Sequence, residues 1–154
     1  MVRKIAIVVL IAALAAGGFA FYQHRATAQR DAAVRQATAA ATAAAQAIFS
    51  YDYRSFDSSV ANGRSFATGD FADEYAKTTA ALKTNAVKEQ AVVRAAVSAT
   101  GVISSSTDRV ELLLYLNQYR RNTNVTGEKV DQNRVVLTML HVDGAWKVSQ
   151  ATAI

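Results

Sequence analysis

The chain has 154 residues, which is the size of one ordinary domain with a segment to spare. It has no cysteine, and its two histidines, His24 and His141, are far apart, which argues against disulfides, thiolate chemistry and most zinc sites. The net charge is +5, but three of the 17 basic residues flank an apolar N-terminal stretch and the others are scattered among 12 acidic ones. A nucleic-acid-binding protein needs a concentrated basic surface, so we expect no nucleic acid as a partner.

The first predicted element is an apolar helix over Ile5–Tyr22, which carries no charged residue. Its 18 residues would span about 27 Å, close to the hydrocarbon thickness of a bilayer. Arg3 and Lys4 precede it and aromatic residues end it, as is typical of a membrane anchor. We therefore predict a short N-terminal tip and a transmembrane helix over residues 1–25. The charges flanking the helix are a weak guide to its orientation, and the prediction of a cytoplasmic tip depends partly on resemblance to a known family. A signal peptide cleaved after Gly18–Ala20 is the alternative.

Residues 26–49 are predicted to continue as a helical stalk into the domain, because alanine makes up 12 of the 22 residues from Ala26 to Ala47. Small and aliphatic side chains recur along one side of this helix with a spacing of about seven residues. A neighbouring helix could pack against them. The alternative is a solvated stalk whose last turns join the domain core. The candidate stalk interface consists of Val34, Ala37, Ala41, Ala44 and Ile48.

Residues 50–154 are predicted to form an α+β domain. Apolar spacings of three and four predict a helix from about residue 71 to 85, with Asp70 as its cap, after a weaker helix interrupted at Asn62-Gly63. The apolar pattern then changes to a period of two, which is typical of strands. Asp143-Gly144 predicts a hairpin turn. The four expected strands cover about residues 91–103, 108–120, 133–142 and 145–152.

This order of elements favours helices packed on one face of a curved, four-stranded antiparallel sheet. His141 shares a strand face with Val135, Leu137 and Met139, so we expect it to be a hydrogen-bonded core or rim residue. We expect Trp146 to pack against a helix.

The stretch from Ser50 to Ser59 concentrates aromatic and charged side chains where the stalk meets the domain. Aromatic rings suit such a corner because they combine a large apolar area with a polar group, and Arg54 is expected to pair with Asp52 or Asp57. The two aspartates and Tyr75 are of the types that support acid–base chemistry, but no histidine, phosphate loop or metal-ligand set accompanies them in the sequence. We therefore predict no catalytic, cofactor or metal site. The predicted structural corner consists of Tyr51, Asp52, Tyr53, Arg54, Phe56 and Asp57.

Three groups of residues recur in an order and spacing that, over roughly residues 46–149, resemble the Mce-associated membrane proteins of mycobacteria and related actinobacteria. The resemblance implies one N-terminal membrane helix and an exported cone-like domain of the nuclear-transport-factor-2 type. The groups are Tyr51-Asp52-Tyr53-Arg54 with Phe56-Asp57, Thr68-Gly69-Asp70-Phe71 with Tyr75, and Val142-Asp143-Gly144 with Trp146.

The resemblance also implies a function. It suggests a non-catalytic accessory subunit of an Mce transporter, a class that imports lipids and sterols, anchored in the inner membrane with its C-terminal domain in the periplasm. The expected partners are Mce subunits or other envelope proteins, and no cofactor is expected. The alternatives are a lipid- or sterol-binding module with a pocket between helices and sheet, or a bridging subunit of a secretion channel.

Overall fold

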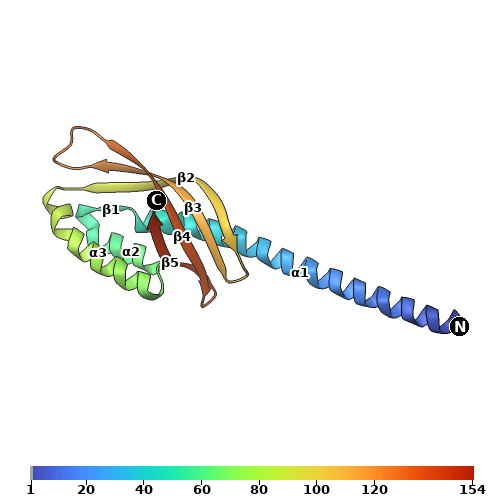
Figure 1. Cartoon of the computed structure of the whole chain (residues 1–154). Helices are drawn as coiled ribbons and strands as arrows, with labels where there is room; N and C mark the ends of the chain where they lie inside the picture. The colour runs from blue at the N-terminus through green and yellow to red at the C-terminus, as the bar shows by residue number, and fades with distance from the viewer. Residues whose placement is uncertain (1) are drawn as a thin grey trace. The chain divides into compact units, whose positions relative to one another are not determined.

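The computed structural model describes the backbone of residues 2–154 and the side chains of residues 21–154. The chain divides into two compact units, Met1–Ala32 and Ala33–Ile154, and its first element is the helix α1 (Val2–Ile48) (Figure 1). Within the part of the chain whose side chains are described, no helix is both long enough and apolar enough to cross a membrane. The predicted anchor is Ile5–Tyr22, and only its last two residues are among those whose side chains are described. The side chains of Arg3 and Lys4 are not described either, so the anchor stays a prediction.

Within the second unit, the last four turns of α1 contribute mainly alanine to the core. Alanine is the strongest helix former, and its short side chain lets a helix lie close to its neighbour. These side chains pack with the leucine and valine side chains of the sheet in one hydrophobic cluster. The buried members from α1 are Ala33, Ala37, Ala41, Ala44, Ala45 and Ile48.

Two further helices follow, α2 (Phe56–Ser65) and α3 (Gly69–Lys88). The predicted interruption of the first at Asn62-Gly63 is wrong, because α2 continues through both residues. The predicted cap Asp70 is also wrong. The N-cap is Thr68, and Asp70 lies in the first turn of α3, where a negative charge is favourable near the helix N-terminus.

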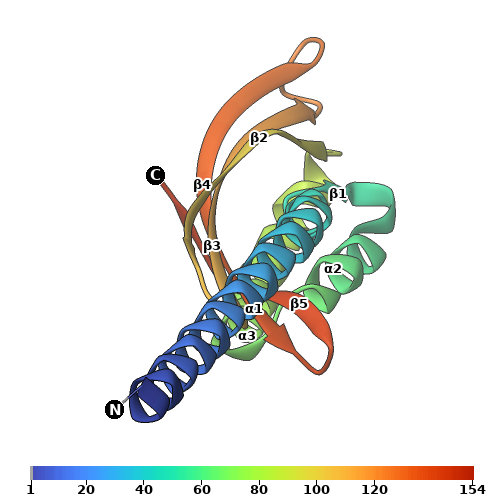
Figure 2. The ribbon, with the colours of Figure 1, turned by 90° about the vertical axis from the view of Figure 1, so that its right-hand side faces the viewer.

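The sheet has five antiparallel strands in sequence order, with α2 and α3 on its concave side (Figure 2). The prediction of helices on a curved antiparallel sheet is confirmed, but the count of four strands is wrong by one. The extra strand has two residues, too few to show an apolar period. The strands are β1 (Tyr51–Asp52), β2 (Val92–Ser105), β3 (Arg109–Arg121), β4 (Lys129–Val142) and β5 (Ala145–Ala153).

The predicted hairpin between β4 and β5 is confirmed. Asp143 and Gly144 have φ values of 51° and 78°, the left-handed backbone that a two-residue hairpin turn requires. The register that follows pairs His141 with Trp146 and Met139 with Val148. The concave face carries the largest of the fully buried side chains, which are Val110, Leu112, Leu114, Leu116, Leu137, Met139 and Val148.

Candidate functional site

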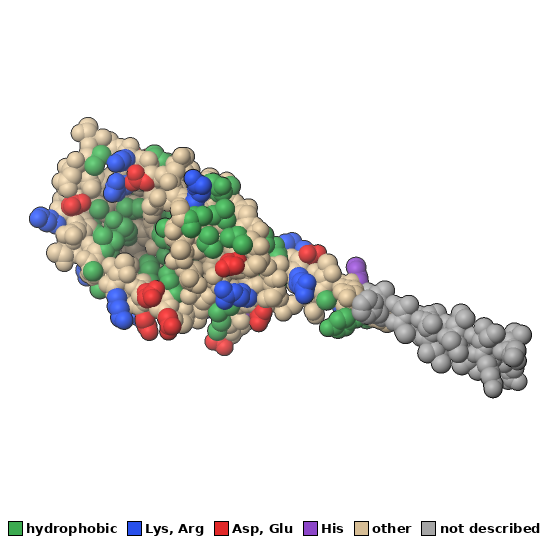
Figure 3. Space-filling model, in the orientation of Figure 1, with side chains coloured by type: hydrophobic (Ala, Val, Ile, Leu, Met, Phe, Trp, Pro, Cys, Tyr) green, Lys and Arg blue, Asp and Glu red, His purple; other side chains and the backbone are tan. Residues whose placement is uncertain are grey.

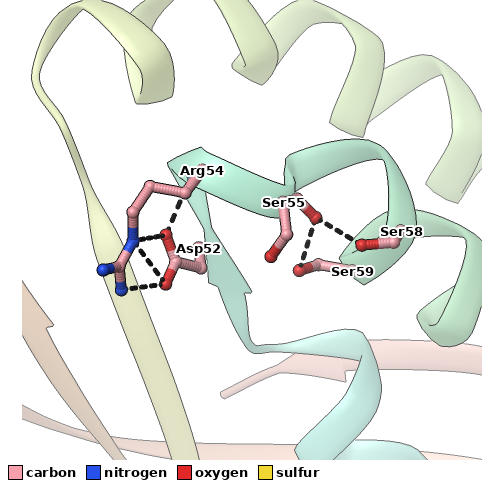
Figure 4. A network of polar contacts seen from close by, with 5 residues as sticks. All are labelled: Asp52, Arg54, Ser55, Ser58 and Ser59. Atoms are coloured by element: carbon pink, nitrogen blue, oxygen red, sulfur yellow. Dashed lines mark hydrogen bonds and ion pairs between the residues drawn. The ribbon is translucent and has the colours of Figure 1, made fainter.

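The predicted corner begins with a two-residue ion pair at the exit of β1. Asp52 caps a single 3-10 turn, Tyr53–Ser55, by accepting from the backbone N–H of Arg54 at 2.9 Å. Its carboxylate also accepts from the Arg54 guanidinium, with Nε at 2.9 Å (Figure 4). The hydrogen bonds from the Arg54 side chain are the main cause that lowers the pKa of Asp52, and the one from the Arg54 backbone N–H is the second. The same side-chain hydrogen bonds raise the pKa of Arg54. Arg54 was expected to pair with Asp52 or Asp57, and in the structure it pairs with Asp52.

The second aspartate ties two helices together. Asp57 lies in the first turn of α2, and its carboxylate accepts from Nζ of Lys83 in α3 at 2.7 and 2.8 Å. At the start of α2, the carbonyl of Ser55 accepts from the hydroxyls of Ser58 and Ser59 (Figure 4). The polar groups of the corner are therefore engaged in holding the chain turn and the α2–α3 pair.

The aromatic residues of the corner differ in depth. Phe56 is 4% exposed and packs with Ala86 and Ala91 in a small second hydrophobic cluster. Tyr51 meets Phe56 edge to face at 5.5 Å, and burial is the main cause that raises the pKa of the Tyr51 phenol. Tyr53 is half-buried and lies under the Arg54 guanidinium. Phe56 is thus the residue that anchors the corner.

The structure does not bring the acid–base candidates into one site. Asp52 and Asp57 have separate basic partners, and Tyr75 lies on α3, where burial raises the pKa of its phenol. Within the part of the chain whose side chains are described, no group of three or more His, Cys, Asp or Glu residues could hold a metal ion. The prediction of no catalytic, cofactor or metal site stays a prediction.

A cavity of about 410 Å³ lies between the two helices α2 and α3 and the concave face of the sheet. We call it the interlayer cavity. The space-filling view shows hydrophobic side chains gathered in a hollow on this side of the domain (Figure 3). Its lining comes from six elements and consists of Ile48, Phe49, Ser50, Tyr51, Phe56, Val60, Phe71, Glu74, Tyr75, Thr78, Thr79, Leu82, Gln118 and Ala151.

One glycine shapes a wall beside this cavity. A Cβ built on Gly63 of α2 would lie 2.2 Å from the hydroxyl of Tyr75 and 3.1 Å from the carbonyl oxygen of Ala47. Only a residue without a side chain lets Tyr75 lie this close to α2. The glycine is therefore a packing requirement, which sequence reasoning took for a helix interruption.

The candidate stalk interface is placed inside the same chain. Ala37, Ala41 and Ala44 have no exposed surface, and Ile48 is 7% exposed, all within the main hydrophobic cluster. Val34 is half-buried. These contacts account for the small-residue seam without a second protein, and a contact of this seam with another helix stays a prediction.

Trp146 packs against α1, as predicted. It is 8% exposed, and its Nε1 donates to Oε1 of Gln36 at 3.3 Å. His141 lies exposed at the rim, with its ring centroid 5.2 Å from that of Trp146. Arg120 and Arg121, at the end of β3, pair with Asp131 and Glu128.

Comparisons with known sequences find a family and several relatives of this chain. A family model described as "Uncharacterized protein Rv1363c/MT1408-like" matches residues 1–154. The chain is 29% identical to "Uncharacterized protein Rv1362c" of Mycobacterium tuberculosis strain H37Rv, covering 96% of this chain and 68% of that protein. It is 33% identical to "Outer membrane protein Rv1973" of the same strain, covering 79% of this chain and 77% of that protein.

Two solved structures show a similar fold at low sequence identity. An IcmL-like type IV secretion system protein from Legionella pneumophila superposes with a TM-score of 0.62 at 17% identity, covering 75% of this chain and 89% of that one. CagV, a VirB8 homologue from Helicobacter pylori, superposes with a TM-score of 0.61 at 11% identity, covering 75% and 93%. At such identities the likeness concerns the fold alone.

Proposed function

The chain belongs to the Rv1363c/MT1408-like family. For this member we propose the function of a non-catalytic accessory protein of the cell envelope that binds other envelope proteins. An envelope location is supported by a relative named as an outer membrane protein and by the likeness to a periplasmic domain, that of DotI. Single-pass anchoring in the inner membrane by residues 1–25, with the domain on the periplasmic side, is part of the proposal.

The observation that carries the proposal is the exposed outer half of β2. The strand pairs with β1 only at Val92 and Val93, so its later residues form a sheet edge to which no other described strand is paired. Val102 is 49% and Ile103 54% exposed. An open strand edge with exposed apolar side chains is a common contact surface for another protein.

The composition of this segment supports the same conclusion. No charged residue occurs from Ala95 to Thr107. Free strand edges usually carry charges or other devices that prevent association, and here the two register shifts at Val97/Ala99 and Val102/Ser104 are the visible ones. An uncharged edge with the exposed apolar side chains Val102 and Ile103 fits a protein that functions within a complex.

Two classes of partner follow from different observations. The sequence resemblance implies subunits of an Mce-type lipid or sterol transporter, and we propose these as the first candidate. The fold likeness to components of type IV secretion systems favours a second candidate role, the bridging of subunits in a secretion channel.

Site-specific photo-crosslinking in native membranes tests the proposal. The full chain would carry p-benzoylphenylalanine at Ile103 or, as a control, at the exposed Lys77 of α3. We expect a defined set of envelope proteins to crosslink at Ile103 and not at Lys77. Mce subunits would identify the first candidate and channel subunits the second. Equal labelling at both positions would contradict a contact through β2.

A further inference from the structure

The interlayer cavity has the size and walls of a small-molecule site. Its volume of about 410 Å³ lies within the roughly 300–1,000 Å³ that is usual for such sites. Phe49, Phe56, Phe71 and Leu82 contribute apolar walls from three different segments, the last two from α3. Such walls favour the apolar body of a ligand, since burying apolar surface is the main favourable term in its transfer from water.

Three polar side chains in the walls already have partners within the chain. The Ser50 hydroxyl accepts from the backbone N–H of Ala95 at 2.9 Å, and the Thr79 hydroxyl donates to the carbonyl of Tyr75 at 2.7 Å. The side chain of Gln118 accepts from Asn133 at 2.8 Å. These groups need no ligand, so they do not determine which head group the cavity would accept.

Among the remaining polar groups, the phenol of Tyr51 is half-buried and that of Tyr75 is buried, whereas Glu74 and Thr78 lie at the exposed side of the cavity. Glu74 and Thr78 lie four residues apart on α3, so they share one face of the helix, and both are exposed. Neither side chain has a hydrogen bond or an ion pair with another of the described side chains. A carboxylate accepts hydrogen bonds, and a threonine hydroxyl both donates and accepts them.

The charge of the lining selects against acids. Its 14 residues include no Lys, Arg or His, and Glu74 is its one charged residue. A fatty acid or a lipid phosphate would place a second negative charge beside this carboxylate, with no cation in the lining to offset it. A hydroxyl head group could donate to Glu74 and accept from Thr78.

From these observations we propose that the interlayer cavity binds a non-acidic lipophilic molecule, with its apolar body among the aromatic side chains and a hydrogen-bond-donating hydroxyl at Glu74 and Thr78. The site is independent of the protein contacts proposed for β2. The polar groups of the corner stabilise the fold, whereas this cavity would bind a ligand.

Photolabelling of the full chain in lipid nanodiscs tests this site. Two diazirine probes of equal chain length would be compared, a dodecanol and a dodecanoic acid, and labelled residues mapped by mass spectrometry. We expect the alcohol to label the cavity residues of α3, and the acid to label them about tenfold less, the factor expected for one hydrogen bond to a charged group. Glu74→Gln should remove most of this preference.

Matched tryptophan variants separate binding in the cavity from partition into the lipid. Thr78→Trp places a large side chain at the open side of the cavity and should abolish labelling of α3. Thr107→Trp, at an exposed position in the β2–β3 turn, should leave it unchanged. If Thr78→Trp does not fold, as judged by circular dichroism, Ala151→Leu fills the cavity from the sheet and should have the same effect. Equal labelling by both probes, or labelling that survives these variants, would overturn the proposal.

Discussion

The concave face of the sheet is covered in two different ways. Along one part, α1 from Ala33 to Ile48 packs against the leucines of β3 and β4, and Ala37, Ala41 and Ala44 keep no exposed surface. We call this the closed half. Along the other part, α2 and α3 face the sheet across the interlayer cavity of about 410 Å³, and this is the open half.

The difference follows from side-chain size. In the closed half, the small alanine side chains of α1 and the leucines of the sheet form one buried hydrophobic cluster. In the open half, the larger side chains Phe56, Phe71 and Tyr75 lie in the walls of the cavity. One small residue, Gly63, lets Tyr75 lie against α2, which brings the helices together while the space in front of the sheet remains. The comparison teaches that one sheet face can hold both a rigid core and a cavity.

The largest effect should come from removing a leucine of the closed half. Leu112 has no exposed surface, so Leu112→Ala should lower the free energy of unfolding by about 2–5 kcal/mol. Leu82 is half-buried and lines the cavity, so Leu82→Ala should cost less than the low end of that range. Urea unfolding of both variants gives the measurement. Equal costs would mean that the two halves are packed alike.

The opposite change, from small to large, should separate the halves again. Ala41→Leu adds volume where no space exists and should destabilise the protein by about 1–3 kcal/mol. Ala151→Leu adds the same atoms beside the interlayer cavity and should be nearly neutral. Thermal unfolding followed by circular dichroism measures both. A loss at Ala151 as large as that at Ala41 would show that the cavity cannot accept a side chain.

A third pair of variants tests the wall formed by α2. Alanine is the better helix former by about 1 kcal/mol, so Gly63→Ala would stabilise an isolated helix. Here the new methyl group must displace the ring of Tyr75, so we expect a lower melting temperature instead. Gly101→Ala is the control, because a Cβ there meets no atom within 4 Å. A raised melting temperature for Gly63→Ala would show that Tyr75 moves freely.

Sequence reasoning predicted the closed half better than the open half. The apolar period of two in β3 and the turn at Asp143-Gly144 are local signals, and both predictions are confirmed. Alanine spacing also identified the buried side of α1, though it could not tell which partner covers it. The reason for Gly63 lies in Tyr75, a contact between different helices that no local propensity contains.

In the corner, too, the contacts between residues close in sequence could be predicted and those between distant residues could not. The Asp52–Arg54 pair spans two residues and could be expected from the sequence. The partner of Asp57 is Lys83, 26 positions away, which only the packing of α2 on α3 brings near. The two-residue β1 and the interlayer cavity leave no periodic trace in the sequence, because both arise from the arrangement of several elements.

The smallest expected effect lies at the corner, where the exposed Asp52–Arg54 pair joins β1 to the open half. Because the hydrogen bonds from Arg54 lower the pKa of Asp52 below its ordinary value of 3.8, the charged carboxylate stabilises the folded chain. This contribution is complete above that ordinary value and is lost as the pH falls through the lower pKa of the folded state. The difference in unfolding free energy between wild type and Asp52→Asn should therefore shrink between about pH 5 and pH 2. Arg54→Gln should remove the part of this pH dependence that comes from the guanidinium and keep the part that comes from the backbone N–H at position 54. The double variant should lose no more of it than Asp52→Asn alone. If wild type and Asp52→Asn kept a constant difference over this range, the pair would contribute to the turn through its shape and not through its charge.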